Sequence, residues 1–396
     1  MARRVFLHVG TRSSGATQMQ SIAWGSARSL REQGLLLPGT AALHGSAARE
    51  VTHANSVLGG ETQSEAAWSR LAAAANRWPG DVLITHDLLS VANAEQATEV
   101  HQTLLPAELH LVLTATALDE VIPASWQELV KSGVPMLYST FVEQIRLNQA
   151  KGARFWLMQD LLDVVRRWGA GIDASHVHIV TAPRRSPDPG PLWRRFASAV
   201  DAGADADLND PELTSRRSVL GPVEVELLRR VHAAQDYRTH GSGHHRWTRR
   251  LLAGEVLARR PGPPISIPDA HLEWVSKRGA ALASGVASAG FDLVGSADDL
   301  HPEKPPAGSR TPRSVTEGEL AEAASWTIGE LQEHWVELEA GTAPPTVGLD
   351  DGVPGILEML EHIRAAGTGG LPRPAPSGEP VGSRYWLRSF KVLRGR

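Results

Sequence analysis

The sequence predicts an α/β fold built around a mostly parallel sheet, and two observations carry this prediction. Short apolar runs alternate along the chain with segments of helical periodicity. Each apolar run is also continuous, which is typical of strands that are buried on both faces. Alternation of this kind places helices on both sides of the sheet. The chain has 396 residues, of which 42% are hydrophobic and 21% are charged, as expected of an ordinary folded protein.

Four strands and four helices are expected from these patterns. The predicted strands are 5–9 (VFLHV), 81–86 (DVLITH), 109–116 (LHLVLTAT) and 177–182 (VHIVTA). The predicted helices are 18–34, 65–78, 117–133 and 155–169. Beyond residue 220 the pattern is more helical, and GFDLVGSADDL (290–300) is expected to close the main domain. Because ligands of such sheets bind at the carboxyl ends of the strands, residues that directly follow a strand are the candidates for chemistry.

The C-terminal part of the chain changes composition. Residues 301–316 are rich in Pro, Gly and Ser, which predicts a linker between a main domain over 1–300 and a helical extension. Two helices are expected within 317–366, and 367–396 is expected to be a flexible basic tail. A basic aromatic tail suits an anionic partner, but a loosely docked terminal segment is the simpler interpretation.

Composition also excludes several classes of function. The net charge of -4 argues against a protein that coats nucleic acid, which usually has a basic domain. The absence of cysteine removes disulfides, thiolate metal sites and cysteine nucleophiles, and it suits a reducing compartment. Neither a signal-peptide core nor a membrane-spanning run is found in the sequence. We therefore expect a cytoplasmic protein without nucleic-acid or membrane partners. The sequence leaves its oligomeric state open.

The first strand leads into a turn that resembles a phosphate-binding loop. Gly10 and Gly15 are separated by four residues, and Thr17 stands where a P-loop has its hydroxyl. Ala16, however, occupies the position of the P-loop lysine. A strand-to-helix turn directs backbone N–H groups and a helix N-terminus at an anion. The loop therefore predicts an anion site whose side chains are altered.

The order of motifs along the chain resembles that of the P-loop sulfotransferases, in the version common in actinobacteria. The resemblance implies a P-loop sulfotransferase-like three-layer fold, here with a helical C-terminal extension. It also implies transfer of a sulfuryl group from 3′-phosphoadenosine 5′-phosphosulfate (PAPS) to a hydroxyl or amine of a small-molecule acceptor, without a metal ion. The segments that carry the resemblance are 6–20, 82–89, 109–131, 155–169, 177–197, 218–231 and 290–300.

The resemblance places the donor-binding residues in the first loop and after the third predicted strand. The loop residues are Gly10, Thr11, Arg12, Ser13, Ser14, Gly15, Ala16 and Thr17. The family loop typically reads Pro-Lys-Thr/Ser-Gly-Thr-Thr, so Ser13 stands where the family has its lysine. The family also binds the 3′-phosphate with an arginine and a serine about eight residues later. Thr116 replaces that arginine, Ala124 replaces the serine, and Ser125 follows one residue late.

Both donor anchors are therefore altered, and the expected losses of binding free energy and of reaction rate are large. A charged hydrogen bond to a phosphate contributes about 1.5–3 kcal/mol. Loss of one preorganised donor commonly lowers a rate by about 10²–10³-fold. Compensation by Arg12, Arg184 or Arg185 is the open alternative, because Arg12 adjoins Ser13 and the other two follow the fourth predicted strand.

His86 and Asp87 follow the strand DVLIT, where the family has an acid/base pair, and they are the catalytic candidates. A histidine near its ordinary pKa of about 6.5 suits a general base, and Asp87 either acts as the base or fixes the tautomer. The alternative is that His86 and Asp87 only cap the neighbouring elements. The candidates for acceptor binding are His53, Gln127 and Lys131.

Three functions remain open from the sequence. The first is an active small-molecule sulfotransferase, with specialised metabolism as one setting. The second is a diverged sulfotransferase fold that no longer uses PAPS and serves other chemistry or ligand binding in the same cleft. The third is a non-catalytic scaffold. HGSGHHRW (240–247) groups three histidines, but no further ligand at suitable spacing completes a metal site there.

Overall fold

The computed structural model describes residues 1–11, 13–53, 66–147, 154–186, 188–203, 219–235, 246–260, 262–338 and 343–366. Arg12, most of the segment HGSGHHRW and the basic tail 367–396 lie outside the described residues.

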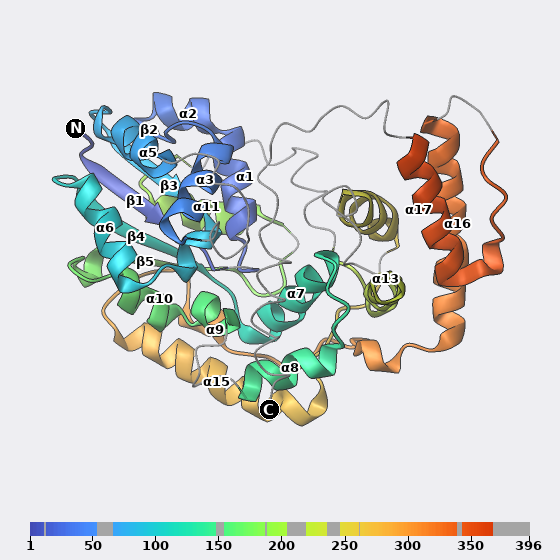
Figure 1. Cartoon of the computed structure of the whole chain (residues 1–396). Helices are drawn as coiled ribbons and strands as arrows, with labels where there is room; N and C mark the ends of the chain where they lie inside the picture. Colours follow the sequence, from blue (N-terminus) through green and yellow to red (C-terminus); the bar gives the residue numbers. More distant parts are fainter. Residues whose placement is uncertain are drawn as a thin grey trace, which may run out of the picture.

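The centre of the molecule is a six-stranded sheet whose strands are all parallel, in the order β2-β3-β1-β4-β5-β6 (Figure 1). The prediction of a mostly parallel sheet is thus confirmed, and the sheet is entirely parallel. The strands are β1 (Arg4–His8), β2 (Leu35–Leu36), β3 (Asp81–Thr85), β4 (Glu108–Ala115), β5 (Val177–Thr181) and β6 (Asp292–Val294).

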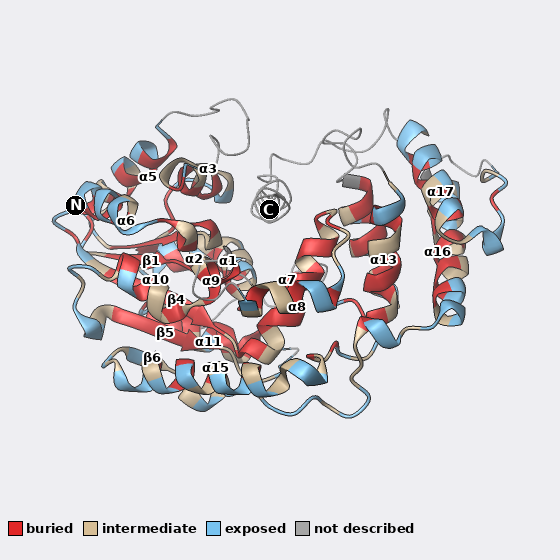
Figure 2. Cartoon of the chain, turned by 60° about the horizontal axis from the view of Figure 1, so that its bottom comes forward, coloured by how far each residue is buried: buried red, intermediate tan, exposed pale blue. Residues whose placement is uncertain are grey.

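Helices cover both faces of the sheet and give the molecule three layers. One face buries Phe6, Val112 and Val180 under α1 (Ala16–Gly25), α2 (Ala27–Glu32) and α11 (Gly190–Ala199). The opposite face packs against five helices: α3 (Ala41–Val51), α5 (Ala67–Asn76), α6 (Ala94–Leu104), α10 (Leu161–Trp168) and α15 (Asp269–Ser288). Figure 2 shows the buried residues along the sheet and on the inward sides of these helices.

A second core, formed mainly by helices, lies beside the sheet. Its members are α7 (Leu118–Lys131), α8 (Tyr138–Leu147), α9 (Arg154–Gln159), α13 (Pro222–Ala234), the π-helix η4 (Arg246–Val256), α16 (Glu317–Leu338) and α17 (Gly352–Ala366). α16 and α17 pack against each other and against α13, on the side away from the sheet (Figure 1). The two helices expected within 317–366 are therefore present, and they share their core with α7 and α13.

Residues 301–316, which lie between β6 and α16 in the chain, make several defined contacts. Glu303 forms ion pairs with Arg184 and Arg185, and the side chain of Arg310 pairs with Glu319. Arg310 also forms an isolated parallel bridge with Ile265. This proline-rich segment is therefore held against neighbouring parts of the molecule by ion pairs.

Two of the predicted helices are each divided into two. The predicted helix 18–34 breaks at Ser26 into α1 and α2, and the predicted helix 155–169 breaks at Asp160 into α9 and α10. The carboxylate of Asp160 accepts a hydrogen bond from the Asp163 N–H at 3.4 Å and so caps α10.

β2 has two residues, too few for a periodic signal. None of the described helices is long and apolar enough to cross a membrane.

Candidate functional site

The order of strands places a topological switch point between β1 and β4. The chain leaves β1 toward β2 on one side and leaves β4 toward β5 on the other. Open parallel sheets bind ligands outside the carboxyl ends of the two strands at such a point. We call this place, formed by residues 9–11, 13–17 and 114–125, the β1/β4 edge. It contains the predicted donor-binding residues that the structure describes.

The loop after β1 is tied to β4 by its own hydroxyls. The Thr11 hydroxyl donates to the Thr114 carbonyl at 3.1 Å. The Ser14 hydroxyl donates to the Thr11 carbonyl at 2.6 Å and lies 2.8 Å from the Thr114 hydroxyl. Thr11 and Ser14 are both buried. These two predicted donor-binding side chains thus hold the loop on the sheet.

Two glycines allow the loop to pack this closely. A Cβ at Gly10 would lie 2.3 Å from the Cβ of Ala16, and a Cβ at Gly15 would lie 2.4 Å from Leu192 Cδ2. Gly15 has a φ of +85° and Ser13 a φ of +60°, both in the left-handed region. The loop therefore makes a tight turn directly before α1.

The N-terminus of α1 opens at the same place. Gly15 is its N-cap residue and supplies no side-chain hydrogen bond, and the first turn holds no acidic residue. The first N–H groups of a helix have no partner within the helix and favour negative charge. Thr17 is exposed on this turn. The start of α1 is therefore left without a side-chain cap and without a carboxylate in its first turn.

The structure brings together two predicted residues that are 112 positions apart. The hydroxyl of Ser125, on α7, lies 3.4 Å from the hydroxyl of Ser13. This separation is longer than a normal hydroxyl hydrogen bond. Thr116 directly follows β4, and its hydroxyl is buried without a hydrogen-bond partner among the described residues. These three hydroxyl side chains are short and uncharged, whereas Asp119 and Glu120 of the same edge form ion pairs with an arginine.

The two arginines that follow β5 are engaged with acidic groups. Arg184 makes a two-point contact with Asp119, at 3.0 and 2.6 Å, and lies 2.7 Å from Glu120. Arg185 pairs with Glu303 at 2.9 Å and with Asp119 at 3.4 Å. Burial raises the pKa of Glu120 above its ordinary value, against the effect of the neighbouring Arg184.

Together these residues form what we call the arginine–acid cluster, whose members are Arg184, Arg185, Asp119, Glu120 and Glu303. It contains three carboxylates and two guanidinium groups, so its positive charge is matched or exceeded by negative charge. Its acidic members Asp119 and Glu120 stand in the first turn of α7, where carboxylates are stabilised by the helix dipole. The cluster therefore offers no uncompensated cation to a phosphate.

His86 and Asp87 lie directly after β3, the strand next to β1. His86 Nδ1 accepts a hydrogen bond from the Leu88 N–H at 3.1 Å and caps the short 3₁₀ helix η1 (Asp87–Val91). The same atom is 3.3 Å from Asp87 Oδ1. An accepting Nδ1 places the proton of the neutral ring on Nε2. His86 thus has the capping role that the sequence left open beside the catalytic one.

Two further histidines surround the end of β3. His8 Nδ1 lies 2.7 Å from the Thr85 hydroxyl, and His44 contacts the backbone of Thr85 and the carbonyl of Pro38. Burial lowers the pKa of His8 to about 3, although the carboxylate of Asp87 acts against this shift. Burial also lowers the pKa of His44 to about 4. Both are neutral structural groups at physiological pH.

Arg49 was missed by sequence reasoning and lies beside His86. A Cβ at Gly45 would lie 3.2 Å from His86 Nε2 and 3.6 Å from Arg49 Nη1. Arg49 donates to the Ser46 hydroxyl at 3.0 Å and forms no ion pair with a described carboxylate. Burial lowers its pKa. The available signal was the spacing of Gly45 and Arg49, which places them on one face of α3.

The predicted acceptor-binding residues lie in three different settings. His53 is exposed at the end of α3, next to residues 54–65, which the structure does not describe. Gln127 is buried, and its side-chain oxygen Oε1 accepts a hydrogen bond from the Leu220 N–H at 3.0 Å. Lys131 pairs with Glu128 at 3.2 Å. Gln127 therefore fixes the backbone before α13.

Comparison with protein-family models, with curated proteins and with solved structures finds no match for this chain.

Proposed function

We propose that this protein is a diverged sulfotransferase-like protein that binds a small, uncharged, hydroxyl-bearing molecule at the β1/β4 edge and does not use PAPS. The observation that carries the proposal is the arginine–acid cluster. Its two guanidiniums are the cations that follow β5, and three carboxylates already neutralise them. A phosphosulfate donor is a polyanion, which this edge of the sheet repels as much as it attracts.

The hydroxyls at the edge support the same proposal. Ser13 and Ser125 are within 3.4 Å of each other, and each hydroxyl both donates and accepts. Thr116 adds a buried hydroxyl without a partner among the described residues. A buried polar group of this kind is stabilised when a ligand supplies the missing hydrogen bond. A ligand with hydroxyl or carbonyl groups fits this set better than an anion does.

The second candidate is a PAPS-dependent sulfotransferase, and Arg49 is the observation that favours it. Its guanidinium lies beside His86 at the end of β3, and its charge is not paired with a described carboxylate. The turn before α1 keeps its left-handed residues and an open helix N-terminus. In this candidate, His86 or Asp87 acts as the general base for a small-molecule acceptor.

A thermal-shift screen separates the two candidates. The panel contains uncharged polyols and sugars, with 3′-phosphoadenosine 5′-phosphate (PAP) as the donor-like probe. We expect a rise in melting temperature with an uncharged compound and none with PAP, because a ligand that binds the folded state stabilises it. Ser13→Leu is expected to abolish the rise, whereas Ser288→Leu, at an exposed position on α15, retains it. A rise with PAP alone would instead support the PAPS-dependent candidate.

A further inference from the structure

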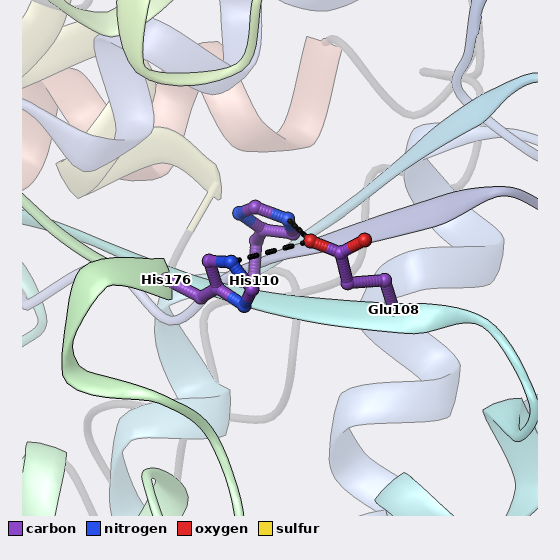
Figure 3. Close-up of side chains that lie close together, drawn as sticks. All are labelled: Glu108, His110 and His176. Carbon is purple, nitrogen blue, oxygen red and sulfur yellow. Dashed lines mark hydrogen bonds and ion pairs between the residues drawn. The ribbon is translucent and has the colours of Figure 1, made fainter.

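A cluster of imidazoles and carboxylates lies at the amino-terminal ends of β4 and β5, the opposite edge of the sheet from the β1/β4 edge. Glu108 and His110 are two residues apart at the start of β4 and share a face of the sheet. His176 ends the 3₁₀ turn η3 (Ala174–His176), directly before β5. Figure 3 shows the Glu108 carboxylate directed at both imidazole rings. One ligand atom from each residue lies within 4.8 Å of the others.

The distances within this triad are close to those of a metal site. Glu108 Oε1 is 3.0 Å from His110 Nε2 and 3.3 Å from His176 Nε2. Around a tetrahedral Zn²⁺ with bonds of about 2.0–2.1 Å, neighbouring ligand atoms are separated by about 3.3–3.4 Å. Both carboxylate–imidazole separations are therefore within about 0.4 Å of the value expected around one ion, and all three ligand atoms lie within 4.8 Å of one another.

A line of hydrogen bonds supports His110 from behind. His110 Nδ1 is 2.8 Å from His178 Nε2, and His178 Nδ1 is 2.6 Å from Asp292 Oδ2. The rings of His110 and His178 are nearly parallel, with an interplanar angle of 8°. Histidine ligands of metals almost always pass their second ring N–H to a carboxylate or another acceptor, which fixes the tautomer. Here the second ring nitrogen of His110 contacts His178, which in turn contacts the Asp292 carboxylate.

We propose that Glu108, His110 and His176 bind a Zn²⁺ ion, with His178 and Asp292 holding His110 in the binding tautomer. Two imidazole nitrogens and one carboxylate oxygen suit Zn²⁺, and water completes the tetrahedron. The side chains of Glu108 and His176 are 50% and 35% exposed, which gives the ion an entry from solvent. The bound ion joins β4 to η3 and stabilises the folded state. This site is independent of the proposed function.

No metal was expected from the sequence, and these residues were not among the candidates. The signal was a pair of i,i+2 patterns, Glu108-Leu109-His110 and His176-Val177-His178, at the starts of two apolar runs. Pairing of these strands in register brings the two patterns together. β4 and β5 pair with Leu111 opposite Val177 and Val112 opposite His178.

Calorimetric titration of the chelator-treated full chain with ZnCl₂ tests the proposal. We expect a stoichiometric site in the wild type that binds at least a hundredfold more weakly in His176→Ala. We expect Asp292→Ala to weaken it about 10–100-fold, the usual effect of losing an outer partner. Substitution of Zn²⁺ by Co²⁺ should give the visible absorption of a tetrahedral site in the wild type, and His176→Ala should lose it.

The histidines of HGSGHHRW provide the control, because three histidines in one segment can capture zinc. The variant His244→Ala/His245→Ala should keep the zinc that His176→Ala loses. The proposal is overturned if the wild type binds no zinc, or if His176→Ala leaves every zinc site intact. Loss of all zinc binding in His244→Ala/His245→Ala overturns it as well. Melting temperatures of the zinc-free variants confirm that each protein is folded.

Discussion

At the carboxyl end of the sheet, short hydroxyls and buried histidines lie beside the arginine–acid cluster, whose charges are paired with one another. The amino end instead carries ion pairs of Arg3 and Arg4 and a group of imidazoles and carboxylates. At the amino end, Arg3 and Arg4 share the carboxylate of Asp81, each at 2.6 Å. Arg184 and Arg185, which follow β5, are therefore paired with carboxylates at the end of the sheet where the resemblance implies a polyanion. The titratable groups suited to a cation gather at the other end.

Acidification is expected to destabilise the carboxyl end of the sheet at a higher pH than the amino end, and this is the largest of the expected effects on stability. The folded pKa values of His8 and His44, about 3 and about 4, lie below the ordinary value of 6.5. Their contribution to stability is therefore complete above pH 6.5 and is lost as the pH falls below it. At pH 5 each costs on the order of 2 kcal/mol. At the amino end, hydrogen bonds and charge from Arg3 and Arg4 outweigh burial and lower the pKa of Asp81 to about 2.

Asp81 thus stabilises the fold above its ordinary pKa of 3.8 and loses this effect only as the pH falls toward 2. Urea unfolding at pH 7.5 and pH 5.0 measures the loss from the two histidines. His8→Leu should reduce the difference between the two values, and His362→Gln, at an exposed position, should preserve it. Equal unfolding free energies at the two pH values for the wild type would contradict buried neutral histidines at the carboxyl end.

Gly15→Ala tests whether the turn at the carboxyl end is as tightly packed as its distances indicate. The substitution combines a left-handed φ of +85° with a Cβ only 2.4 Å from Leu192 Cδ2. We expect it to lower the free energy of unfolding by about 2–4 kcal/mol. Gly171→Ala is the matched control, because Gly171 has a φ of +82° with open space around it. That change should cost only about 1 kcal/mol.

Equal costs for Gly15→Ala and Gly171→Ala would show that the loop yields to the added methyl group. In that case the loop after β1 would be adaptable, and the close contact with α11 would not define its shape. Denaturant unfolding of the two variants under the same conditions gives the comparison directly.

Ser14→Ala and Ser13→Ala distinguish structural from ligand-facing hydroxyls within the same loop. Ser14 is buried and contacts both Thr11 and Thr114, so its loss should cost about 1–3 kcal/mol. Ser13 is partly exposed, and its loss should change stability by less than about 0.5 kcal/mol. The reverse ranking in urea unfolding would mean that Ser13, rather than Ser14, anchors the loop.

Much of the fold was predictable because each long strand is a continuous apolar run. β1, β3, β4 and β5 were expected within a residue of their observed bounds. β2 has only two residues, so no pattern could indicate it. The break between α9 and α10 was missed because the helical period continues across Asp160, where a side-chain cap starts a new helix.

The site was less predictable, since its chemistry depends on contacts between distant residues. The resemblance assigned Ser13 and Ser125 to one donor site, so a shared site was expected for these two residues. The partners of Arg184 were not, because Asp119 lies 65 positions away and its pairing depends on how α7 enters from β4. Sequence alone presented Arg184 as a cation near the site, and only the structure shows that its charge is neutralised.

Calorimetric titration with PAP tests the central claim most directly, that the β1/β4 edge no longer binds a phosphosulfate donor. We predict no heat of binding for the wild type. The variant Ser13→Lys/Thr116→Arg restores the family's two charged anchors and should gain measurable binding. Tight binding of PAP by the unaltered chain would contradict the claim and would identify this edge as a working donor site.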